Sequence, residues 1–561
     1  MHSAHIGFVG NGRVSGWFDF TEFQALDRVI AELFIDDVRT GDAVCAKTSV
    51  HADWSCLIPR AFGDGKAHEV RVRFRARDRI LNEITWSGIL SDHPYNFHID
   101  EVTPKVIRGW VKESGLSRKT MIVELRIGDE PVSRTTANRH RGEVRAAGYH
   151  EGNFGFELHV PLEARFTGAI ASLGVLQEDG TFFTLDAVHL VQGPVKVMFV
   201  TDASDPANAS RYYRAQLQGR QLWQAGAEVA VKHRAEVTGN MITTFDVVVL
   251  QRVPMNPALR AAVKLARDGG AVILYETDDL NVFAELADQI GAVRSGFRRI
   301  YDEEFLKEIR DRYASLTCSD AVIVPNRFME RYFQQRGFEV IFSQFVVDAK
   351  LPKAIADRSS VGWKMLYLSG SPTHRADLDT VIDDLHAFMS DHPDAELTVL
   401  GHSDPSAFHG WERTSFHPAV SYTDMIQFIG GFDIVIVPFE KTVFNYAKSA
   451  TKVLEAACVG VPVIASAVPD YVQAVKDAHA GYVVPWGTNW RTVLGQAYAN
   501  READRASFHR LVQFAELRSS GLRGGSELLT AFCTLYRNVI CLPPTYRATG
   551  TNRDTAVAAR A

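Results

Sequence analysis

Apolar and polar positions follow two different patterns along the chain. Strict alternation at residues 67–77 and 121–129 predicts strands with one buried face, and turn signals such as Asp64-Gly65 separate such stretches. Beyond residue 192, short apolar runs alternate with stretches of helical periodicity, which is typical of βαβ units around a parallel sheet. The pattern therefore predicts a β-rich first third followed by an α/β remainder.

A faint internal repeat runs through the β-rich part. Three segments recur: VSGW at 14–17 as IRGW at 107–110, LFID at 33–36 as LRIG at 125–128, and CLIP at 56–59 as ELHVP at 157–161. We predict two small β-sandwich modules, residues 1–95 and 96–192. The alternative is chance similarity among β-rich segments.

The apolar runs of the α/β part have the length of buried parallel strands. They lie at 195–200, 246–250, 271–275, 321–325, 364–368, 396–400, 433–438 and 462–466. Helical periodicity lies between them, at 210–226, 258–270 and 450–460 among others. These strands are too numerous for one nucleotide-binding domain, so the pattern predicts two doubly wound halves with a crevice between them.

A polar stretch at 348–362 separates the two predicted halves. We therefore place an N-terminal half at 193–347 and a C-terminal half at 348–542. The C-terminal half includes a return helix at 525–540, with Ser526 as its N-cap. Residues 543–561 are small and polar and predict a disordered tail.

Composition places the chain among ordinary globular proteins. It has 561 residues, a net charge of −6, 46% hydrophobic and 23% charged residues. These values exclude wholesale disorder, collagen and coiled coil. The slight acidity argues against a protein that coats nucleic acid, so we expect no nucleic-acid partner.

Cysteine spacing and the absence of long apolar runs indicate the compartment. None of the six cysteines forms a C-x-x-C pair, and no Cys/His cluster has zinc spacing, so we expect a reducing compartment and no metal site. The first residues lack the pattern of a signal peptide, and no apolar run approaches the ~20 residues that cross a bilayer. We expect a cytoplasmic protein, with any contact to the inner membrane peripheral.

One predicted strand ends in a small polar turn, SGSPTHR at 369–375, and a helix follows it. Small residues such as Gly370 and Ser371 let backbone N–H groups approach a phosphate, and the helix N-terminus adds positive potential. His374 also follows the strand, and Arg375 adds direct charge. The turn predicts phosphate binding; the alternative is an ordinary turn between a strand and a helix.

Polar residues after the strand at 433–438 recur at a spacing of three or four: Asn445, Lys448, Ser449, Lys452 and Glu455. On a helix they would lie near one face. Lysines at the head of such a helix suit a diphosphate, and a carboxylate further along suits the hydroxyls of a ribose or hexose. The alternative is a solvated surface face, but the flanking residues are mostly small or apolar.

Together these motifs resemble those of the GT-B-fold glycosyltransferases, in particular the retaining family-4 group (glycosyl transferases group 1) of bacterial surface-polysaccharide enzymes. The carrying motifs are SGSPTH-x-x-D at 369–377, N-x-x-K-S-x-x-K-x-L-E at 445–455 and G-x-P-V-I-A-S at 460–466. Supporting motifs are SRYYR at 210–214, LQR at 250–252, YETDDL at 275–280 and AVIVPN at 321–326. The resemblance covers about 195–540. It implies two Rossmann-like halves, with the acceptor on the N-terminal side and the nucleotide-sugar donor on the C-terminal side.

One position departs from the family pattern. Many members carry two glutamates in an E-x7-E motif, and Glu455 matches the second, which implies that it grips the nucleotide ribose. The first position is Ala447. Either Asn445 or Lys448 substitutes for the missing carboxylate on the sugar side, or the donor sugar is unusual.

In the N-terminal half, charged residues follow two predicted strands. Asp278 and Asp279 would bind acceptor hydroxyls or assist proton transfer; the alternative is that they cap a helix. Arg211 and Arg214 would hold an acceptor diphosphate, or they are helix-surface charges. We expect Asp278, Asp279 and Lys448 to be catalytic, with no cofactor besides the nucleotide-sugar co-substrate.

The resemblance implies a glycosyltransferase that moves a hexosyl or deoxyhexosyl group, with retention and without a metal. The donor would be a nucleoside diphosphate sugar, and the acceptor a glycan or lipid-linked glycan of bacterial surface polysaccharide. Two alternatives remain. One is a nucleotide-sugar epimerase or hydrolase on the same fold, and the other is a catalytically degenerate protein that binds glycan.

Overall fold

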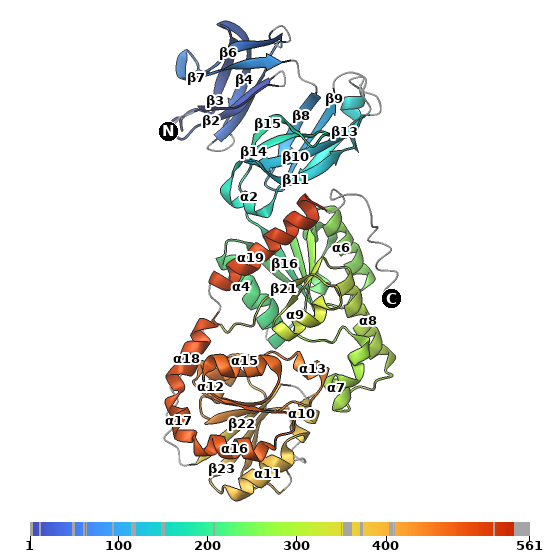
Figure 1. Ribbon diagram of the computed structural model, residues 1–561, viewed down its shortest axis with the longest axis vertical. Helices are drawn as coiled ribbons and strands as arrows, with labels where there is room; N and C mark the ends of the chain where they lie inside the picture. Colours follow the sequence, from blue (N-terminus) through green and yellow to red (C-terminus); the bar gives the residue numbers. More distant parts are fainter. Residues whose placement is uncertain are drawn as a thin grey trace. The chain divides into compact units, whose positions relative to one another are not determined.

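The computed structural model describes residues 4–10, 13–47, 51–59, 62, 64–91, 95–113, 119–146, 152–205, 208–348, 351, 362–370, 374–402, 408, 410–519 and 522–543. The chain divides into two compact units (Figure 1). The first comprises Met1–Pro194 with Cys533–Ala561, and the second comprises Val195–Phe532. The predicted tail from residue 544 onward and most of the dividing stretch at 348–362 lie outside the described residues.

The first unit begins with two antiparallel sheets. Their strand orders are β1 (Ala4–Gly10), β2 (Arg13–Asp19), β5 (His51–Leu57), and β4 (Val38–Ala46), β3 (Arg28–Ile35), β6 (Asp64–Ala76), β7 (Arg79–Ser91). One apolar cluster takes side chains from both sheets, among them Phe18, Trp54 and Phe74. The alternation seen in the sequence thus turns one face of each sheet toward a shared core.

Two further antiparallel sheets follow in the same unit. Their orders are β12 (Arg139–His140), β13 (Asn153–His159), β9 (Val106–Glu113), β8 (Tyr95–Val102), and β11 (Glu130–Ala137), β10 (Met121–Ile127), β14 (Ile170–Leu176), β15 (Phe182–His189). The short helices α1 (Gly142–Ala146) and α2 (Leu162–Thr167) lie between strands. Apart from the added β12, the strand order repeats that of the first pair of sheets, and a separate apolar cluster fills this second pair.

The glycine of the repeated motif has a packing reason in both copies. A Cβ on Gly16 of β2 would lie 1.9 Å from the carbonyl oxygen of His5, and one on Gly109 of β9 would lie 2.2 Å from that of His98. Neither distance is sterically possible, so the neighbouring strand approaches closely only because a glycine stands there.

The C-terminal residues of the chain pack on the second pair of sheets. Helix α19 (Leu522–Tyr536) continues into the π-helical η7 (Arg537–Cys541). Arg165 donates a hydrogen bond of 3.2 Å to the Tyr536 hydroxyl, and Cys541 donates one of 3.6 Å to the carbonyl of His159. Tyr536 and Cys541 are both fully buried, and η7 packs against β11 and β13 of this unit.

The prediction that Ser526 caps the return helix was wrong, because α19 begins at Leu522. Gly524 and Gly525 precede Ser526 and imitate a helix boundary in the sequence. Within the second unit, a Cβ on Gly525 would lie 2.0 Å from the carbonyl oxygen of Gln221. The glycines therefore serve close packing inside the helix instead of marking its start.

The second unit holds two six-stranded parallel sheets. The N-terminal half has the order β17 (Glu228–His233), β16 (Lys196–Thr201), β18 (Val247–Gln251), β19 (Val272–Glu276), β20 (Ala321–Val324), β21 (Val340–Phe342). The C-terminal half has the order β24 (Thr414–His417), β23 (Ala395–Gly401), β22 (Trp363–Ser369), β25 (Ile434–Val437), β26 (Val463–Ser466), β27 (Tyr482–Val484). All eight predicted strands are confirmed. The pattern of apolar runs did not predict β17, β21, β24 and β27, which are the edge strands of the two sheets and are partly exposed.

Helices flank both sheets (Figure 1). Those of the N-terminal half are α3 (Ala209–Arg211), η2 (Tyr212–Leu217), α4 (Gln218–Gln224), η3 (Arg234–Glu236), α5 (Gly239–Ile242), α6 (Pro257–Asp268), η4 (Ala284–Gln289), α7 (Gly291–Arg294), α8 (Glu303–Thr317) and α9 (Arg327–Gln334). Those of the C-terminal half are α10 (Arg375–Asp379), α11 (Ile382–Asp391), α12 (Tyr422–Ile429), α13 (Val443–Tyr446), α14 (Thr451–Cys458), α15 (Pro469–Ala478), α16 (Trp490–Ala499), α17 (Arg501–Ala506) and α18 (Phe508–Leu517). Among the described residues, no helix has the length and apolar character needed to cross a membrane.

Candidate active site

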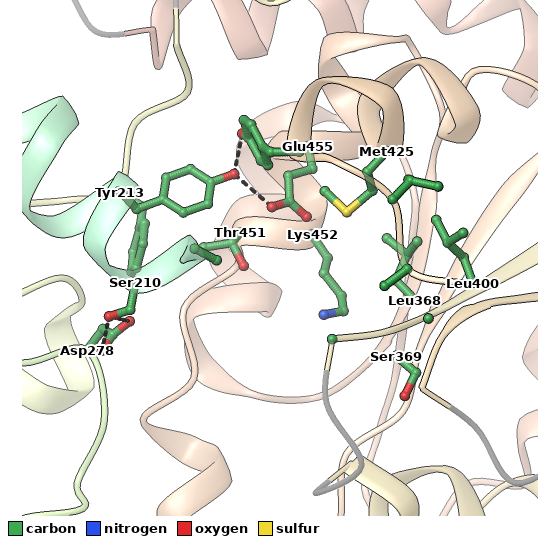
Figure 2. A pocket seen from close by; sticks show the side chains of 17 residues that line it. Ser210, Tyr213, Asp278, Leu368, Ser369, Leu400, Met425, Thr451, Lys452 and Glu455 are labelled. Carbon is green, nitrogen blue, oxygen red and sulfur yellow. Dashed lines mark hydrogen bonds between the residues drawn. The ribbon is translucent and has the colours of Figure 1, made fainter. Parts of the chain in front are cut away.

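A cavity of about 400 Å³ opens at the carboxyl ends of the strands in the second unit (Figure 2). In open parallel sheets, ligands bind at this edge, where the strand order reverses. In the C-terminal half the reversal lies between β22 and β25. The cavity is lined by Ala209, Ser210, Tyr213, Asp278, Phe345, Leu368, Ser369, Gly370, Leu400, Gly401, Ala419, Val420, Tyr422, Met425, Thr451, Lys452 and Glu455. Of the predicted site residues, it therefore contains Gly370, Lys452, Glu455 and Asp278.

The segment that carries the five predicted polar residues forms two short helices instead of one. Helix α13 ends at Tyr446 and α14 begins at Thr451, so Lys448 and Ser449 lie in the break between them. The expectation of one shared helix face was wrong. The cause is tertiary, because Phe444 and Ala447 pack into the apolar core of the N-terminal half.

Lys452 lies in the first turn of α14, beside the end of β22. Figure 2 shows its side chain entering the cavity and its ammonium on the side where Ser369 lies. Burial lowers the pKa of Lys452, and the nearby Glu455 offsets part of that shift. A partly desolvated ammonium beside a helix N-terminus attracts an anion, and a phosphate group would fit both.

Glu455 lies one turn further along α14 and is 7% exposed. Its Oε1 accepts a hydrogen bond of 2.7 Å from the Tyr213 hydroxyl, which also bonds to the hydroxyl of Tyr422. Burial raises the pKa of Glu455, while Lys452 and the Tyr213 hydrogen bond act in the opposite direction. The site thus offers a buried carboxylate, already fixed at one oxygen, at the wall of the cavity.

Asp278 and Asp279 follow β19 and form an ionic network with two cations. Arg252 Nη1 lies 3.0 Å from Asp278 Oδ1, and its Nη2 lies 3.5 Å from Asp279 Oδ2. Lys448 Nζ lies 2.6 Å from Asp279 Oδ1. Burial alone would raise the pKa of Asp279, but Lys448 and Arg252 outweigh burial and bring the pKa below its ordinary value. The carboxylate stays ionised at neutral pH.

The alternative that these two aspartates cap a helix does not hold. The next helix, η4, begins at Ala284 and has no side-chain cap. Arg252 instead takes an unusual backbone conformation, with a φ of 54° in the left-handed region. A long side chain there is strained, and such strain concentrates at functional sites.

Asp377 organises the other predicted donor residues. Its Oδ1 accepts hydrogen bonds from Asn445 Nδ2 at 2.8 Å and from the backbone N–H of Glu440 at 2.9 Å. Its Oδ2 lies 3.2 Å from His374 Nδ1. Burial lowers the pKa of His374, and the Asp377 hydrogen bond restores only part of it. The imidazole is therefore mostly neutral at pH 7.

The remaining predicted residues lie outside the cavity wall. Ser449 Oγ is 3.0 Å from Asn326 Nδ2, and Arg375 is exposed, with its Nε 3.7 Å from Asp379. Ser371 lies outside the described residues. Ser449 and Arg375 thus belong to the predicted donor motifs but do not line the cavity.

The two predicted acceptor arginines already have partners inside the N-terminal half. Arg211 donates a hydrogen bond of 3.0 Å to the carbonyl of Ala203. Arg214 is 1% exposed, forms an ion pair with Glu276 and donates a hydrogen bond of 2.9 Å to the carbonyl of Ser343. Their proposed contact with an acceptor diphosphate stays a prediction.

Sequence reasoning missed four residues of this region as site residues: Tyr213, Arg252, Asn326 and Asp377. Arg252 directly follows a predicted strand, so the rule that ligands lie beyond strand ends could have found it. All four lie inside the motifs that carry or support the family resemblance, at 210–214, 250–252, 321–326 and 369–377. Tyr213 reaches Glu455 from a π-helix in the other half of the unit, and no local signal announces that contact. The described residues contain no group of three or more acidic, histidine or cysteine side chains that could hold a metal ion.

Residues 364–493 match the model of the family described as glycosyl transferases group 1. The chain carries a glycosyl transferases group 1 domain. The matched segment contains β22 from its second residue onward, β23 to β27, α14 and the predicted donor residues Gly370, Lys452 and Glu455. No curated protein sequence matches the chain.

Three solved structures share a similar course of the backbone. HepE of Anabaena in complex with UDP is 12% identical, with 61% of this chain and 100% of that chain covered at a TM-score of 0.44. Sucrose-phosphate synthase of Thermosynechococcus elongatus is 16% identical, with 61% and 99% covered at 0.46. WaaG, a glycosyltransferase involved in lipopolysaccharide biosynthesis, is 14% identical, with 60% and 99% covered at 0.41.

Proposed function

We propose that this protein transfers a hexosyl or deoxyhexosyl group from a nucleoside diphosphate sugar to a glycan or lipid-linked glycan. One observation carries the proposal. In a glycosyl transferases group 1 domain, the ammonium of Lys452, the backbone at Gly370 and the carboxylate of Glu455 line one cavity. A cation beside a helix N-terminus suits a diphosphate, and a carboxylate one turn away suits paired hydroxyls.

The donor lies with its diphosphate at Lys452 and the N-terminus of α14, and with its ribose at Glu455. The apolar side chains of Leu368, Leu400 and Met425 line the same cavity and supply a surface for the base. An apolar wall with a few placed polar groups is the usual composition of a small-molecule site.

In the reaction, the bond between the anomeric carbon and the β-phosphate oxygen breaks, and the diphosphate leaves with the electron pair. The acceptor hydroxyl oxygen forms the new bond, and Asp278, which lines the cavity, takes up its proton. Lys448 and Lys452 neutralise the charge that grows on the diphosphate, so no divalent ion takes part. We include retention of the anomeric configuration because the family-4 enzymes that the chain resembles are retaining.

The parts of the chain share this work. The N-terminal half, 193–347, takes the acceptor, and the C-terminal half, 348–542, takes the donor. Residues 1–95 and 96–192 are two β-sandwich modules. The product belongs to bacterial surface polysaccharide, and the protein is cytoplasmic, with peripheral contact at the inner membrane.

A thermal-shift screen against UDP-, dTDP-, GDP- and ADP-sugars tests the donor assignment. A ligand that binds only the native state raises the melting temperature according to RT ln(1 + [L]/Kd), so the cognate nucleotide should stand out. Mass spectrometry of the product then separates transfer from the alternatives. Free nucleoside diphosphate with a lengthened acceptor supports transfer, an isomerised donor indicates an epimerase, and free sugar alone indicates a hydrolase. If no nucleotide stabilises the protein, the proposal is wrong.

A further inference from the structure

The Tyr213 phenol connects the two halves of the second unit at the cavity. Tyr213 belongs to η2 of the N-terminal half, and its hydroxyl donates to Oε1 of Glu455 in α14 of the C-terminal half. The two residues are 6% and 7% exposed. Figure 2 shows the phenol pointing at the carboxylate. The same hydroxyl also hydrogen-bonds to the hydroxyl of Tyr422.

Local structure holds this phenol in one place. A π-helical turn replaces the regular α-helix at Tyr212–Leu217, and such turns are frequent at functional sites. The Tyr213 ring lies edge-on to Phe345 and to Tyr422, with centroids 5.4 Å and 5.3 Å away. The ring also belongs to the apolar core of the C-terminal half. A ring packed on two sides has little freedom, so its hydroxyl fixes the direction of its partner.

The hydrogen bond leaves part of the carboxylate available. A carboxylate has two oxygens that accept hydrogen bonds, and Tyr213 uses Oε1. Figure 2 shows the second oxygen on the side of the cavity where Lys452 lies. A hydroxyl group that enters the cavity can therefore meet Oε2 while the phenol keeps Oε1.

We propose that Tyr213 is a positioning residue for the nucleotide: its hydrogen bond to Oε1 orients the Glu455 carboxylate so that Oε2 receives the ribose hydroxyls. This inference rests on the proposed function, which assigns the ribose to Glu455. It adds a residue of the acceptor-side half to the donor site. Donor affinity then depends on the arrangement of the two halves that brings Tyr213 to Glu455.

The phenol also influences the charge of the carboxylate. The titratable groups that face Glu455 are Lys452 of α14, Tyr213 of η2, Tyr422 of α12 and Tyr471 of α15. Burial raises the pKa of Glu455, and both Lys452 and the Tyr213 hydrogen bond lower it again. Without the phenol hydroxyl the pKa rises further. The ionised form is then lost at a higher pH as the solution is acidified, and nucleotide affinity falls with it.

The test compares Tyr213→Phe with Tyr422→Phe by calorimetry against UDP, dTDP, GDP and ADP across a pH series. Each variant removes one hydroxyl from the same tyrosine pair, but only Tyr213 reaches Glu455. We expect Tyr213→Phe to raise the Kd of the nucleotide that binds by about tenfold at neutral pH. We also expect the pH at which affinity is lost to move upward. Tyr422→Phe removes a hydroxyl that lines the same cavity but bonds Tyr213 instead of the carboxylate, so it should raise Kd less, by about threefold, the size of a typical neutral hydrogen bond.

A double-mutant cycle with Glu455→Gln separates positioning from general packing. If Tyr213 acts through the carboxylate, Tyr213→Phe has little further effect on Kd when Glu455 is already Gln. Equal losses in both tyrosine variants with parallel pH profiles, or additive losses in the cycle, would overturn the inference. Wild-type protein that binds none of the four nucleotides would instead overturn the proposed function itself, and this inference with it.

Discussion

At the scale of single residues, the site is a balance of four charges. Asp278 and Asp279 meet Arg252 and Lys448, so two carboxylates are matched by two cations. Lys448 is the member that comes from the C-terminal half. Its side chain is 20% exposed, and its ammonium bonds Asp279 of the N-terminal half, close to the cavity where the diphosphate is proposed to lie.

Replacing Lys448 with alanine should reduce kcat by about 100-fold and change donor affinity much less. The reason is that the charge it neutralises grows mainly in the transition state. Steady-state kinetics on Lys448→Ala give both quantities. Lys441→Ala, which removes an exposed lysine seven positions earlier, is the matched control and should behave as wild type. A normal kcat with only a raised KM would show that Lys448 binds the ground state.

Activity should persist in excess chelator, because Lys448 and Lys452 supply the positive charge that a divalent ion supplies elsewhere. The measurement is the rate of transfer before and after dialysis against EDTA. Under the same conditions, changing Asp278 and Asp279 together to asparagine should abolish transfer and leave nucleotide affinity intact. If magnesium or manganese restores a rate that EDTA removed, the two aspartates become metal-ligand candidates.

At the scale of elements, the break between α13 and α14 ties the donor segment to the opposite half. Asn326, at the N-terminus of α9, donates hydrogen bonds to the carbonyl of Ala447 at 2.7 Å and to Ser449 Oγ at 3.0 Å. Its own Oδ1 caps α9 by accepting from the N–H of Met329. One buried side-chain amide thus caps the start of α9 and holds the break between α13 and α14.

Asn326→Ala should destabilise the protein by about 1–3 kcal/mol, because it leaves buried polar groups unpaired, and should weaken nucleotide binding. Asn326→Ser separates the two roles. Serine still caps α9 but is too short to reach the break, so it should recover about 1 kcal/mol of stability without recovering affinity. Chemical denaturation and calorimetry measure the two effects. Full recovery of affinity in the serine variant would contradict this division.

Packing also explains the departure from the family's E-x7-E motif. Ala447 is fully buried in the apolar core of the N-terminal half, so a glutamate there would be an unpaired charge. We expect Ala447→Glu to destabilise the protein by about 3–5 kcal/mol instead of improving the enzyme. Lys441→Glu places the same side chain at an exposed position of the segment and should be tolerated. A stable Ala447→Glu variant with raised activity would contradict this reading of the core.

At the scale of the whole molecule, the chain crosses from one compact unit to the other twice. Val195 begins the second unit, and the chain leaves it again within α19, after Phe532. The last described residues then pack against β11 and β13 of the first unit. Arg537 forms ion pairs with Glu130 and Glu163 there, and Tyr536 is fully buried.

This arrangement changes the design of a truncated protein. Deleting residues 1–192 alone should leave Tyr536 and Cys541 without the core that buries them, and the product should aggregate. A fragment of residues 193–532 should stay soluble and bind nucleotide, because both parallel sheets remain complete. Size-exclusion chromatography and calorimetry on the two fragments check this. Equal solubility of both would show that residues 533–543 contribute little to the first unit.

The sequence by itself determined the elements whose signals are local. The eight buried strands are short apolar runs, and a strand that is buried on both faces of a parallel sheet has this composition. The repeated VSGW and IRGW motifs mark β2 and β9, which occupy equivalent places in the two pairs of sheets. Each strand needs its glycine against a carbonyl of the neighbouring strand. The motifs after β22 and β25 contain Gly370, Lys452 and Glu455, which line the cavity, and ligand residues follow strand ends in such sheets.

Only the tertiary structure decided what depends on contacts between distant segments. The single helix that would carry Asn445 to Glu455 on one face is broken before Thr451, because Phe444 and Ala447 pack into the core of the other half. Arg214 pairs with Glu276, and Tyr213 reaches Glu455, across separations that periodicity does not encode. Local propensity reflects only the free energy of placing a residue's own backbone in a helix or a strand. The partner that a side chain finds is set by the packing of whole sheets, and that information is spread over the entire chain.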